Sequence, residues 1–369
     1  MPTFKADVAV LGGGPGGSSA SIECARAGLR VVQVEREQFP REHVGETLHP
    51  GVEPLLTQLG VWEDVQRANF LRHEGNWIEW AGERRFEAFG ADADGGAWQG
   101  LQAWRADFDA ILLERARALG VRVLQPCQAV RPLLAGQRVV GLETSHGDLH
   151  APFVVDAAGD RHWLARQLHL PIKKYSRRLT ARYGYVEGVC AARDEAPQIV
   201  SDARGWTWTA RVRPQLYQWT RLSVAGEKDD GAIEEAEGAI VSSRGGRGEK
   251  YLPSEFHGLK RRGASKGADV TWRLVERAAG AGYFLVGDAA AVLDPASSHG
   301  VLKAIMAGMM AAHSIAHVFA HRLTEQDAAR GYCDWVREWF EHDVRRLTEL
   351  YSIFDTHAGS VRLAAATEE

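Results

Sequence analysis

Six consecutive residues near the N-terminus have the types and spacing of a phosphate-binding turn. Within the run 12–17 (GGGPGG), Gly12, Gly14 and Gly17 match the pattern G-x-G-x-x-G. In that pattern the first glycine permits a tight turn, the second lets the backbone approach a pyrophosphate, and the third lets the helix pack against a strand. Glu35 follows about 20 residues later, where an acid can hydrogen-bond a ribose hydroxyl. The spacing therefore predicts a dinucleotide site.

The elements that such a turn requires are indicated on both sides of it. Residues 6–11 form a short apolar run typical of a buried strand, 18–27 favour a helix, and 30–35 favour a second strand. The N-terminus of that helix offers free N–H groups and a partial positive charge to phosphates. The alternative is an ordinary glycine-rich turn, with Glu35 as a surface charge.

Two later motifs distinguish FAD from NAD. The run 105–109 (RADFD) opens an expected helix, and 287–290 (GDAA) ends an expected strand. Together with the glycine turn, these motifs resemble those of the large family of FAD-dependent aromatic hydroxylases, flavin-dependent halogenases and geranylgeranyl-type reductases, over most of residues 6–322. The resemblance implies that Arg105 contacts the flavin side of FAD and that Asp288 contacts its ribityl-pyrophosphate part; Asp288 could otherwise be a helix N-cap.

The segment 297–301 (SSHGV) lies where this family places the flavin ring against the start of a long helix. Backbone N–H groups there can stabilise the negative charge of reduced flavin, and Gly300 permits close approach. His299 could assist proton transfer, or it could cap or pack against the helix. The motifs and the resemblance together imply the following cofactor-binding residues: Gly12, Gly14, Pro15, Gly17, Glu35, Arg36, Arg41, Arg105, Val130, Asp288, Pro295, Gly300 and Val301.

The segment 39–51 (FPREHVGETLHPG) resembles the G-E-S/T-L-x-P segment of the halogenase-like branch, which lies along the FAD channel. Arg41 is the candidate there for a pyrophosphate or flavin contact, and Glu46 for anchoring the loop. Both could instead be ordinary loop residues.

The residues that distinguish halogenases from hydroxylases favour a hydroxylase. Flavin-dependent halogenases use a lysine in a pattern like F-x-x-K-x-G, and His73 takes that position in 70–75 (FLRHEG). They also tend to carry W-x-W-x-I-P, of which 206–211 (WTWTAR) retains both tryptophans but neither the isoleucine nor the proline. The runs 294–303 and 343–351 resemble most closely the flavoprotein monooxygenases that hydroxylate a tryptophan during tryptophylquinone maturation.

Tryptophans gather in the two windows where the family builds its substrate sheet. The chain has 12 tryptophans. An aromatic wall can hold a flat substrate and exclude water, although the same side chains could fill an interdomain core. The candidate substrate residues are Trp77, Trp80, Trp206 and Trp208.

The expected activity is that of an FAD-dependent monooxygenase that hydroxylates an aromatic substrate through a C4a-hydroperoxyflavin. The substrate is a small molecule or a tryptophan of a partner protein, and His73 and His299 are the candidate acid–base residues. Because no second glycine fingerprint is visible, NAD(P)H would bind transiently or a partner flavin reductase would supply electrons. The alternatives are a halogenase lacking the usual lysine, a geranylgeranyl-type reductase, and a non-catalytic FAD-binding assembly factor that docks through the aromatic C-terminal helix.

Bulk properties limit the remaining classes. A net charge of -4 argues against general nucleic-acid binding, and four scattered cysteines suggest neither a metal site nor disulfides, which suits a cytoplasmic protein. The apolar run 301–319 carries Lys303 and two histidines, so we expect a buried helix and no membrane span. Residues 51–68 are expected to be helical, and 178–224 to form an antiparallel sheet.

The expected fold is α/β, with a Rossmann-like FAD-binding domain of the glutathione-reductase and aromatic-hydroxylase type. An antiparallel β-sheet substrate domain is inserted into it, and helices end the chain. A length of 369 residues suits two joined domains. The expected boundaries are 1–70, 100–165 and 270–325 for the FAD-binding domain, 71–99 and 166–269 for the substrate domain, and 326–369 for the C-terminal helical segment.

Overall fold

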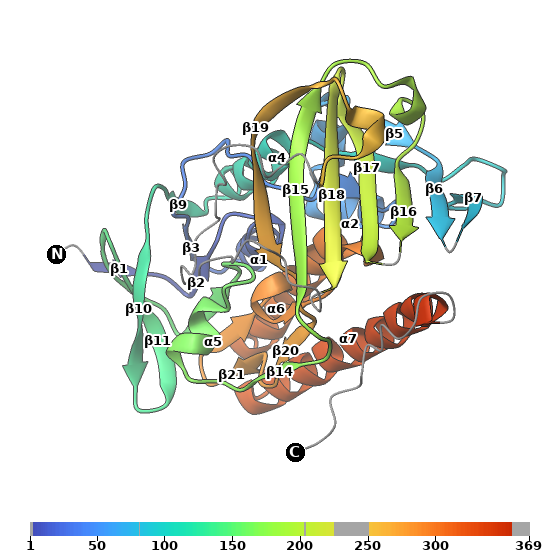
Figure 1. Cartoon of the computed structure of the whole chain (residues 1–369). Helices are drawn as coiled ribbons and strands as arrows, with labels where there is room; N and C mark the ends of the chain where they lie inside the picture. Colours follow the sequence, from blue (N-terminus) through green and yellow to red (C-terminus); the bar gives the residue numbers. More distant parts are fainter. Residues whose placement is uncertain (1–2, 81, 203, 225–250, 356–369) are drawn as a thin grey trace.

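The computed structural model describes residues 3–80, 82–202, 204–224 and 251–355 (Figure 1). Residues 225–250 of the expected substrate domain and residues 356–369 of the expected C-terminal helical segment lie outside the described residues. The described chain is a mixed α/β protein with a six-stranded sheet, a seven-stranded sheet and smaller sheets of three and four strands. This confirms the expected fold class.

The six-stranded sheet carries the glycine turn. Its strands lie in the order β21-β22-β13-β2-β3-β9, and all neighbours are parallel except β21 and β22. Every residue of β2 and β3 is buried, as parallel strands covered on both faces require. The strands are β2 (Val8–Leu11), β3 (Val31–Val34), β9 (Arg122–Leu124), β13 (Phe153–Asp156), β21 (Ala279–Gly280) and β22 (Tyr283–Leu285).

Helix α1 (Pro15–Arg26) packs against both α4 (Arg105–Ala118) and α6 (Gly300–Phe319). The contact between α1 and α6 is close because glycines form it: a Cβ on Gly308 would overlap the carbonyl oxygen of Gly16. Of the described helices, α6 has the length and mean hydropathy (1.4) that would let a helix cross a membrane. Among the described elements it contacts α1, α2, α7 and the short helix η4 (Gly287–Ala289).

The seven-stranded sheet has the order β19-β15-β18-β17-β16-β6-β7 (Figure 1). It is antiparallel except where β16 and β6 run parallel, with Gln198 opposite Trp77. This pair joins two segments far apart in sequence, whereas the strands within 178–224 pair antiparallel as expected. The strands are β6 (Gly75–Trp80), β7 (Glu83–Ala88), β15 (Leu179–Glu187), β16 (Gln198–Asp202), β17 (Gly205–Arg213), β18 (Leu216–Val224) and β19 (Lys260–Asp269).

Short helices and three smaller sheets make up the rest of the described chain. The expected helix at 51–68 is two helices, since Gly60 adopts φ 71° and ends α2 after Leu59. The helices are α2 (Val52–Leu59), α3 (Trp62–Arg67), α5 (Trp163–Gln167), η1 (Ala191–Arg193), η3 (Ser254–Phe256), η4 (Gly287–Ala289) and η5 (Pro295–Ser297). The strands are β4 (Thr47–Leu48), β5 (Leu71–His73) and β8 (Gly100–Gln102) in one sheet; β14 (Ile172–Lys174), β20 (Arg273–Val275) and β23 (Ala291–Val292) in another; and β1 (Thr3–Lys5), β10 (Ala129–Ala135), β11 (Arg138–Thr144) and β12 (Gly147–His150) in a third.

The last helix, α7 (Glu325–Asp355), packs against α6. Lys303 of α6 forms an ion pair with Asp343 of α7 and lies 4.1 Å above the ring of Trp339. Farther along α7, Leu347 and Tyr351 are buried in an aromatic cluster of the protein itself. The aromatic side of α7 therefore covers the protein's own core.

Candidate functional site

The glycine turn has a geometry that only glycine permits. Gly12 adopts φ 104°, and a Cβ there would overlap the carbonyl oxygen of Ala157. A Cβ on Gly17 would overlap the carbonyl oxygen of Gly12. Gly14 is the N-cap of α1 and supplies no side-chain cap, so the first-turn N–H groups are open to an anion. A dinucleotide pyrophosphate fits this geometry.

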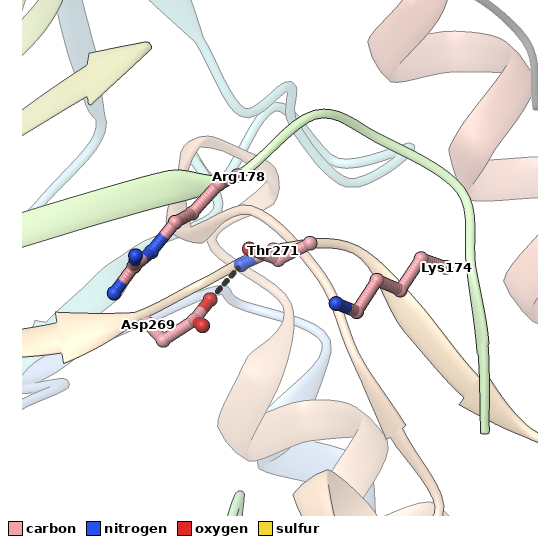
Figure 2. A pocket seen from close by; sticks show the side chains of 4 residues that line it. All are labelled: Lys174, Arg178, Asp269 and Thr271. Atoms are coloured by element: carbon pink, nitrogen blue, oxygen red, sulfur yellow. Dashed lines mark hydrogen bonds between the residues drawn. The ribbon is translucent and has the colours of Figure 1, made fainter. Parts of the chain in front are cut away.

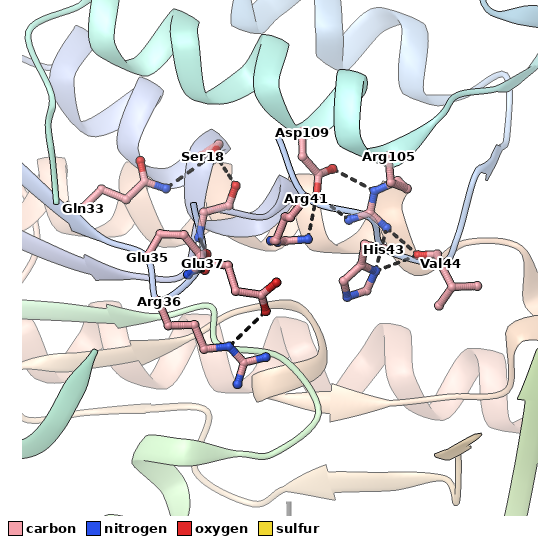
Figure 3. A network of polar contacts seen from close by, with 11 residues as sticks. Ser18, Gln33, Glu35, Arg36, Glu37, Arg41, His43, Val44, Arg105 and Asp109 are labelled. Carbon is pink, nitrogen blue, oxygen red and sulfur yellow. Dashed lines mark hydrogen bonds and ion pairs between the residues drawn. The ribbon is translucent and has the colours of Figure 1, made fainter. Parts of the chain in front are cut away.

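Glu35 braces the turn from the end of β3. One carboxylate oxygen accepts from the Gly13 N–H at 2.6 Å, and the other accepts from the Glu37 N–H at 2.8 Å (Figure 3). Each oxygen keeps further capacity to accept, so the ribose contact stays a prediction. Arg36 is exposed, and its Nε lies 3.3 Å from Glu37.

The guanidinium of Arg41 lies beside the glycine turn. The atom nearest to a Cβ built on Gly14 is Nη2 of Arg41, at 3.6 Å. The Nη1 atom of Arg41 is buried, lies 3.5 Å from Asp109 Oδ2, and has no hydrogen-bond partner among the described residues. A buried donor that makes an ion pair but no hydrogen bond is costly, and a phosphate oxygen would supply the missing hydrogen bond. The residues present therefore fit the pyrophosphate of FAD.

Arg105 is largely engaged by the protein itself. Its guanidinium forms a bidentate pair with Asp109, at 2.7 and 2.9 Å, and Nη1 donates to the Val44 carbonyl at 2.8 Å (Figure 3). The same loop is held from the other side, because the Tyr185 hydroxyl donates to the buried carboxylate of Glu46. Arg105 thus fixes the loop 41–46 against α4, and its flavin contact stays a prediction.

Asp288 lies in η4, directly after β22. Although Asp288 keeps exposed surface, desolvation by the surrounding protein, together with the charge of Asp160, raises the pKa of its carboxyl to about 6. The turn is held by His162, whose Nδ1 lies 2.9 Å from the Ala289 carbonyl and whose Nε2 accepts from Arg273 Nε at 2.8 Å. No local pattern singled out His162 as a residue that holds this turn.

The start of α6 is open, as a flavin-ring site requires. His299 is the N-cap residue and makes no side-chain cap, so the first-turn N–H groups stay free. Apart from its chain neighbours and its own helix backbone, no atom of the described residues lies within 4 Å of a Cβ built on Gly300, whereas Val301 is half-buried. Two further predicted cofactor residues, Pro295 before α6 and Val130 on β10, are exposed.

Four rings link the start of α6 to β5, and we call them the histidine row: His299, His49, Phe89 and His73. The centroids of His299 and His49 lie 5.1 Å apart, those of His49 and Phe89 5.4 Å, and those of Phe89 and His73 5.4 Å. The two predicted acid–base residues therefore stand at the two ends of one row. His49 and Phe89 were missed, because only the fold brings them together.

Burial keeps the histidine row uncharged near neutral pH. It lowers the pKa of His73 to about 4. It also lowers the pKa of His299 to about 4, and the repulsion between His299 and His49 when both are protonated acts in the same direction. The Nδ1 atom of His49 accepts from the Gly51 N–H at 3.0 Å, which places the proton of the neutral ring on Nε2. The row can accept and donate hydrogen bonds without carrying charge.

The predicted substrate tryptophans have two different surroundings. Trp80 and Trp206 are buried in the cluster that contains Tyr351, and Trp206 Nε1 donates to the Tyr351 hydroxyl at 2.7 Å. That hydroxyl in turn donates to Asp294, in the loop before α6. Trp208 is half-buried, and so is Trp77, which lies 5.3 Å from the ring of Phe86. Trp80 and Trp206 thus have the interior surroundings that the alternative interpretation expected.

A polar cavity of about 250 Å³ is lined by none of the predicted site residues. Figure 2 shows Lys174 and Arg178 beside Asp269, whose carboxylate accepts from the Thr271 N–H at 2.9 Å.

Comparison with known proteins identifies the family. Residues 5–225, more than half of the chain, match the family model described as "FAD binding domain". The chain belongs to this FAD-binding family. Its fold and its motifs are those of the superfamily of FAD-dependent monooxygenases and flavin-dependent halogenases.

Individual members of the superfamily differ in activity. A tryptophan 2-halogenase of Chondromyces crocatus is 31% identical over 350 residues, which are 88% of this chain and 64% of that halogenase. The myxobacterial chondrochloren halogenase CndH is 26% identical, with a TM-score of 0.86 over 99% of this chain and 87% of CndH. A probable FAD-dependent monooxygenase of Pseudomonas aeruginosa, PqsL, shares the fold at 18% identity, with a TM-score of 0.75 over 95% and 97% of the two chains.

Proposed function

We propose that this flavoprotein oxidises an aromatic substrate by oxygen transfer, as an FAD-dependent monooxygenase. The observation that carries the proposal is the uncharged histidine row, which runs from the open N-terminus of α6 to His73. When bound, FAD supplies the electrons and the place where dioxygen is activated. The glycine turn and Arg41 would hold its pyrophosphate, and the free N–H groups at the start of α6 would face its ring.

The chain's own residues have three tasks in this scheme. The row lines the space between the start of α6 and His73, where it would hold the substrate ring and exclude water. His299 exchanges a proton beside the flavin, which its lowered pKa allows, since the ring is neutral and free to accept. His73 does so at the far end, beside the substrate.

Halogenation is the second candidate. It is favoured by the similarity to the tryptophan 2-halogenase of Chondromyces crocatus and to the halogenase CndH. The resemblance implies that such enzymes use a lysine amine where this chain has His73. A neutral imidazole lacks the charge and the reach of a lysine ammonium, so the substitution supports oxygen transfer.

One experiment separates the candidates. The FAD-loaded protein receives NAD(P)H, a flavin reductase and a panel of aromatic compounds, with and without chloride or bromide, and products are identified by mass spectrometry. We expect addition of one oxygen atom whether or not halide is present. A halide-dependent halogenated product would establish the second candidate.

The same assay addresses the partner and the remaining alternatives. Turnover without the reductase would assign hydride transfer to transiently bound NAD(P)H, and turnover only with it would assign a reductase partner. Anaerobic reduction of an isoprenoid alkene would identify a geranylgeranyl-type reductase. A flavin that neither donor reduces would identify an assembly factor. Modification of a tryptophan in a co-expressed amine oxidase or dehydrogenase would identify a protein substrate.

A further inference from the structure

One face of the small sheet β4-β8-β5 carries polar side chains. Thr47 lies opposite Gln102, and His73 lies opposite Gly100. Residues directly opposite each other in antiparallel strands share a face, so Thr47, Gln102 and His73 lie on the same side. A Cβ on Gly100 would come within 2.7 Å of the His73 ring, so the imidazole lies over this glycine.

The polar atoms on this face are not all satisfied. Gln102 Oε1 accepts from the Thr47 hydroxyl at 2.9 Å. Gln102 Nε2 and both ring nitrogens of His73 are buried without a hydrogen-bond partner among the described residues. The two side chains are only 3% and 4% exposed. Buried polar groups are almost always paired, so three such atoms on one face indicate a ligand.

The unpaired atoms stand at the end of the histidine row. His73 touches Phe89, and Phe89 leads through His49 to the start of α6. Because Gln102 is the diagonal neighbour of His73 across β5 and β8, one small group can reach both side chains.

We propose that Gln102 and His73 bind the hydroxyl group of a phenolic substrate. An amide Nε2 can only donate, whereas a ring nitrogen of neutral histidine can accept. A phenol oxygen accepts from Gln102 and donates its proton to a His73 nitrogen, so one hydroxyl satisfies both residues. This inference rests on the proposed function and gives it a substrate class.

The test measures binding to the oxidised FAD-loaded protein, without a reductant. The probes are p-cresol and toluene, which differ by one hydroxyl, and binding is followed by calorimetry. We expect p-cresol to bind about tenfold more tightly than toluene. Gln102→Met and His73→Leu should each remove most of this preference and leave toluene binding unchanged. Gln218→Met, the same change on β18, should keep the preference. Equal binding of the probes, no binding of either, or a preference that survives both variants would overturn the proposal.

A stability measurement separates this role from a structural one. Replacing an unpaired buried polar group by an apolar one of similar shape is close to neutral for stability. We therefore expect His73→Leu to unfold at nearly the same urea concentration as the wild type, whereas Gln102→Met also loses the hydrogen bond from Thr47 and should unfold at a slightly lower concentration. A clearly lower midpoint for His73→Leu would mean that its ring nitrogens serve the fold, and would overturn the proposal. Normal p-cresol binding without oxygenated product would instead contradict only the proposed function.

Discussion

Asp294 offers the sharpest test of how the loop before α6 is held. Its carboxylate is fully buried, and it accepts from the Ala296 N–H at 2.8 Å and from the Tyr351 hydroxyl. Burial still raises the pKa of Asp294 from 3.8 to about 6. The folded protein thus holds this proton more tightly than the unfolded chain. The carboxyl therefore contributes stability that is complete below about pH 3.8 and is lost as the pH rises through 6.

The perturbation is Asp294→Asn, which removes the titration. The pKa difference corresponds to about 3 kcal/mol in total, of which about 2 kcal/mol falls between pH 4.5 and 7.5. Urea unfolding of the FAD-loaded wild type and variant across this range gives the difference in their free energies of unfolding. We expect that difference to shift in favour of Asp294→Asn by about 2 kcal/mol as the pH rises. The exposed Asp94, changed to Asn, is the control and should show no such shift. A difference that stays constant, or that shifts the other way, would refute the reasoning.

Three further changes test the cofactor site and the histidine row. Gly17→Ala should give protein that retains no flavin, since the added methyl group would overlap the Gly12 carbonyl; the absorbance of the purified protein is the measurement. Arg41→Leu should weaken FAD binding by at least about tenfold in calorimetry, because a charge-assisted hydrogen bond is lost, whereas Arg67→Leu should change it little because Arg67 is exposed on α3 and belongs to no predicted site. Gly100→Ala should lower the free energy of unfolding by about 1–3 kcal/mol in urea, because its Cβ would lie 2.7 Å from the His73 ring. Undiminished stability of the last variant would contradict the described position of the imidazole.

Local patterns predicted much of the FAD-binding half. The glycine turn, the strand that ends at Glu35 and the helix at 300–319 each depend on neighbouring residues, and the structure has all three. The expected helix at 51–68 was wrong only at its centre, where Gly60 takes a left-handed conformation. Turn, strand and helix signals are local, so they can be read from a single sequence.

The candidate site depended on contacts that no local pattern encodes. The histidine row joins the 44–51 segment, β5 and α6, and nothing in the spacing of His49 and His73 relates them. The parallel pairing of β16 with β6 is equally long-range. For the same reason the sequence did not show whether Trp206 lines the substrate site or fills the core, because its hydrogen-bond partner Tyr351 lies 145 residues away. Alternation can place a side chain on one face of a strand, but it does not tell what covers that face.

The glycine contact between α1 and α6 fixes the distance between the N-terminal ends of these two helices. Gly16 lies at the beginning of α1, and its neighbours on α6 are Ala304 and Gly308, one to two helical turns after the first residue of that helix. At 1.5 Å per residue, the start of α6 extends about 6 Å beyond the nearer of these contacts. The two helix ends that would face the phosphates and the ring are therefore set on one rigid frame. The fold therefore sets the separation between the pyrophosphate site and the ring site independently of the cofactor. A ligand whose phosphates and ring are closer together or farther apart would contact one helix N-terminus but not the other.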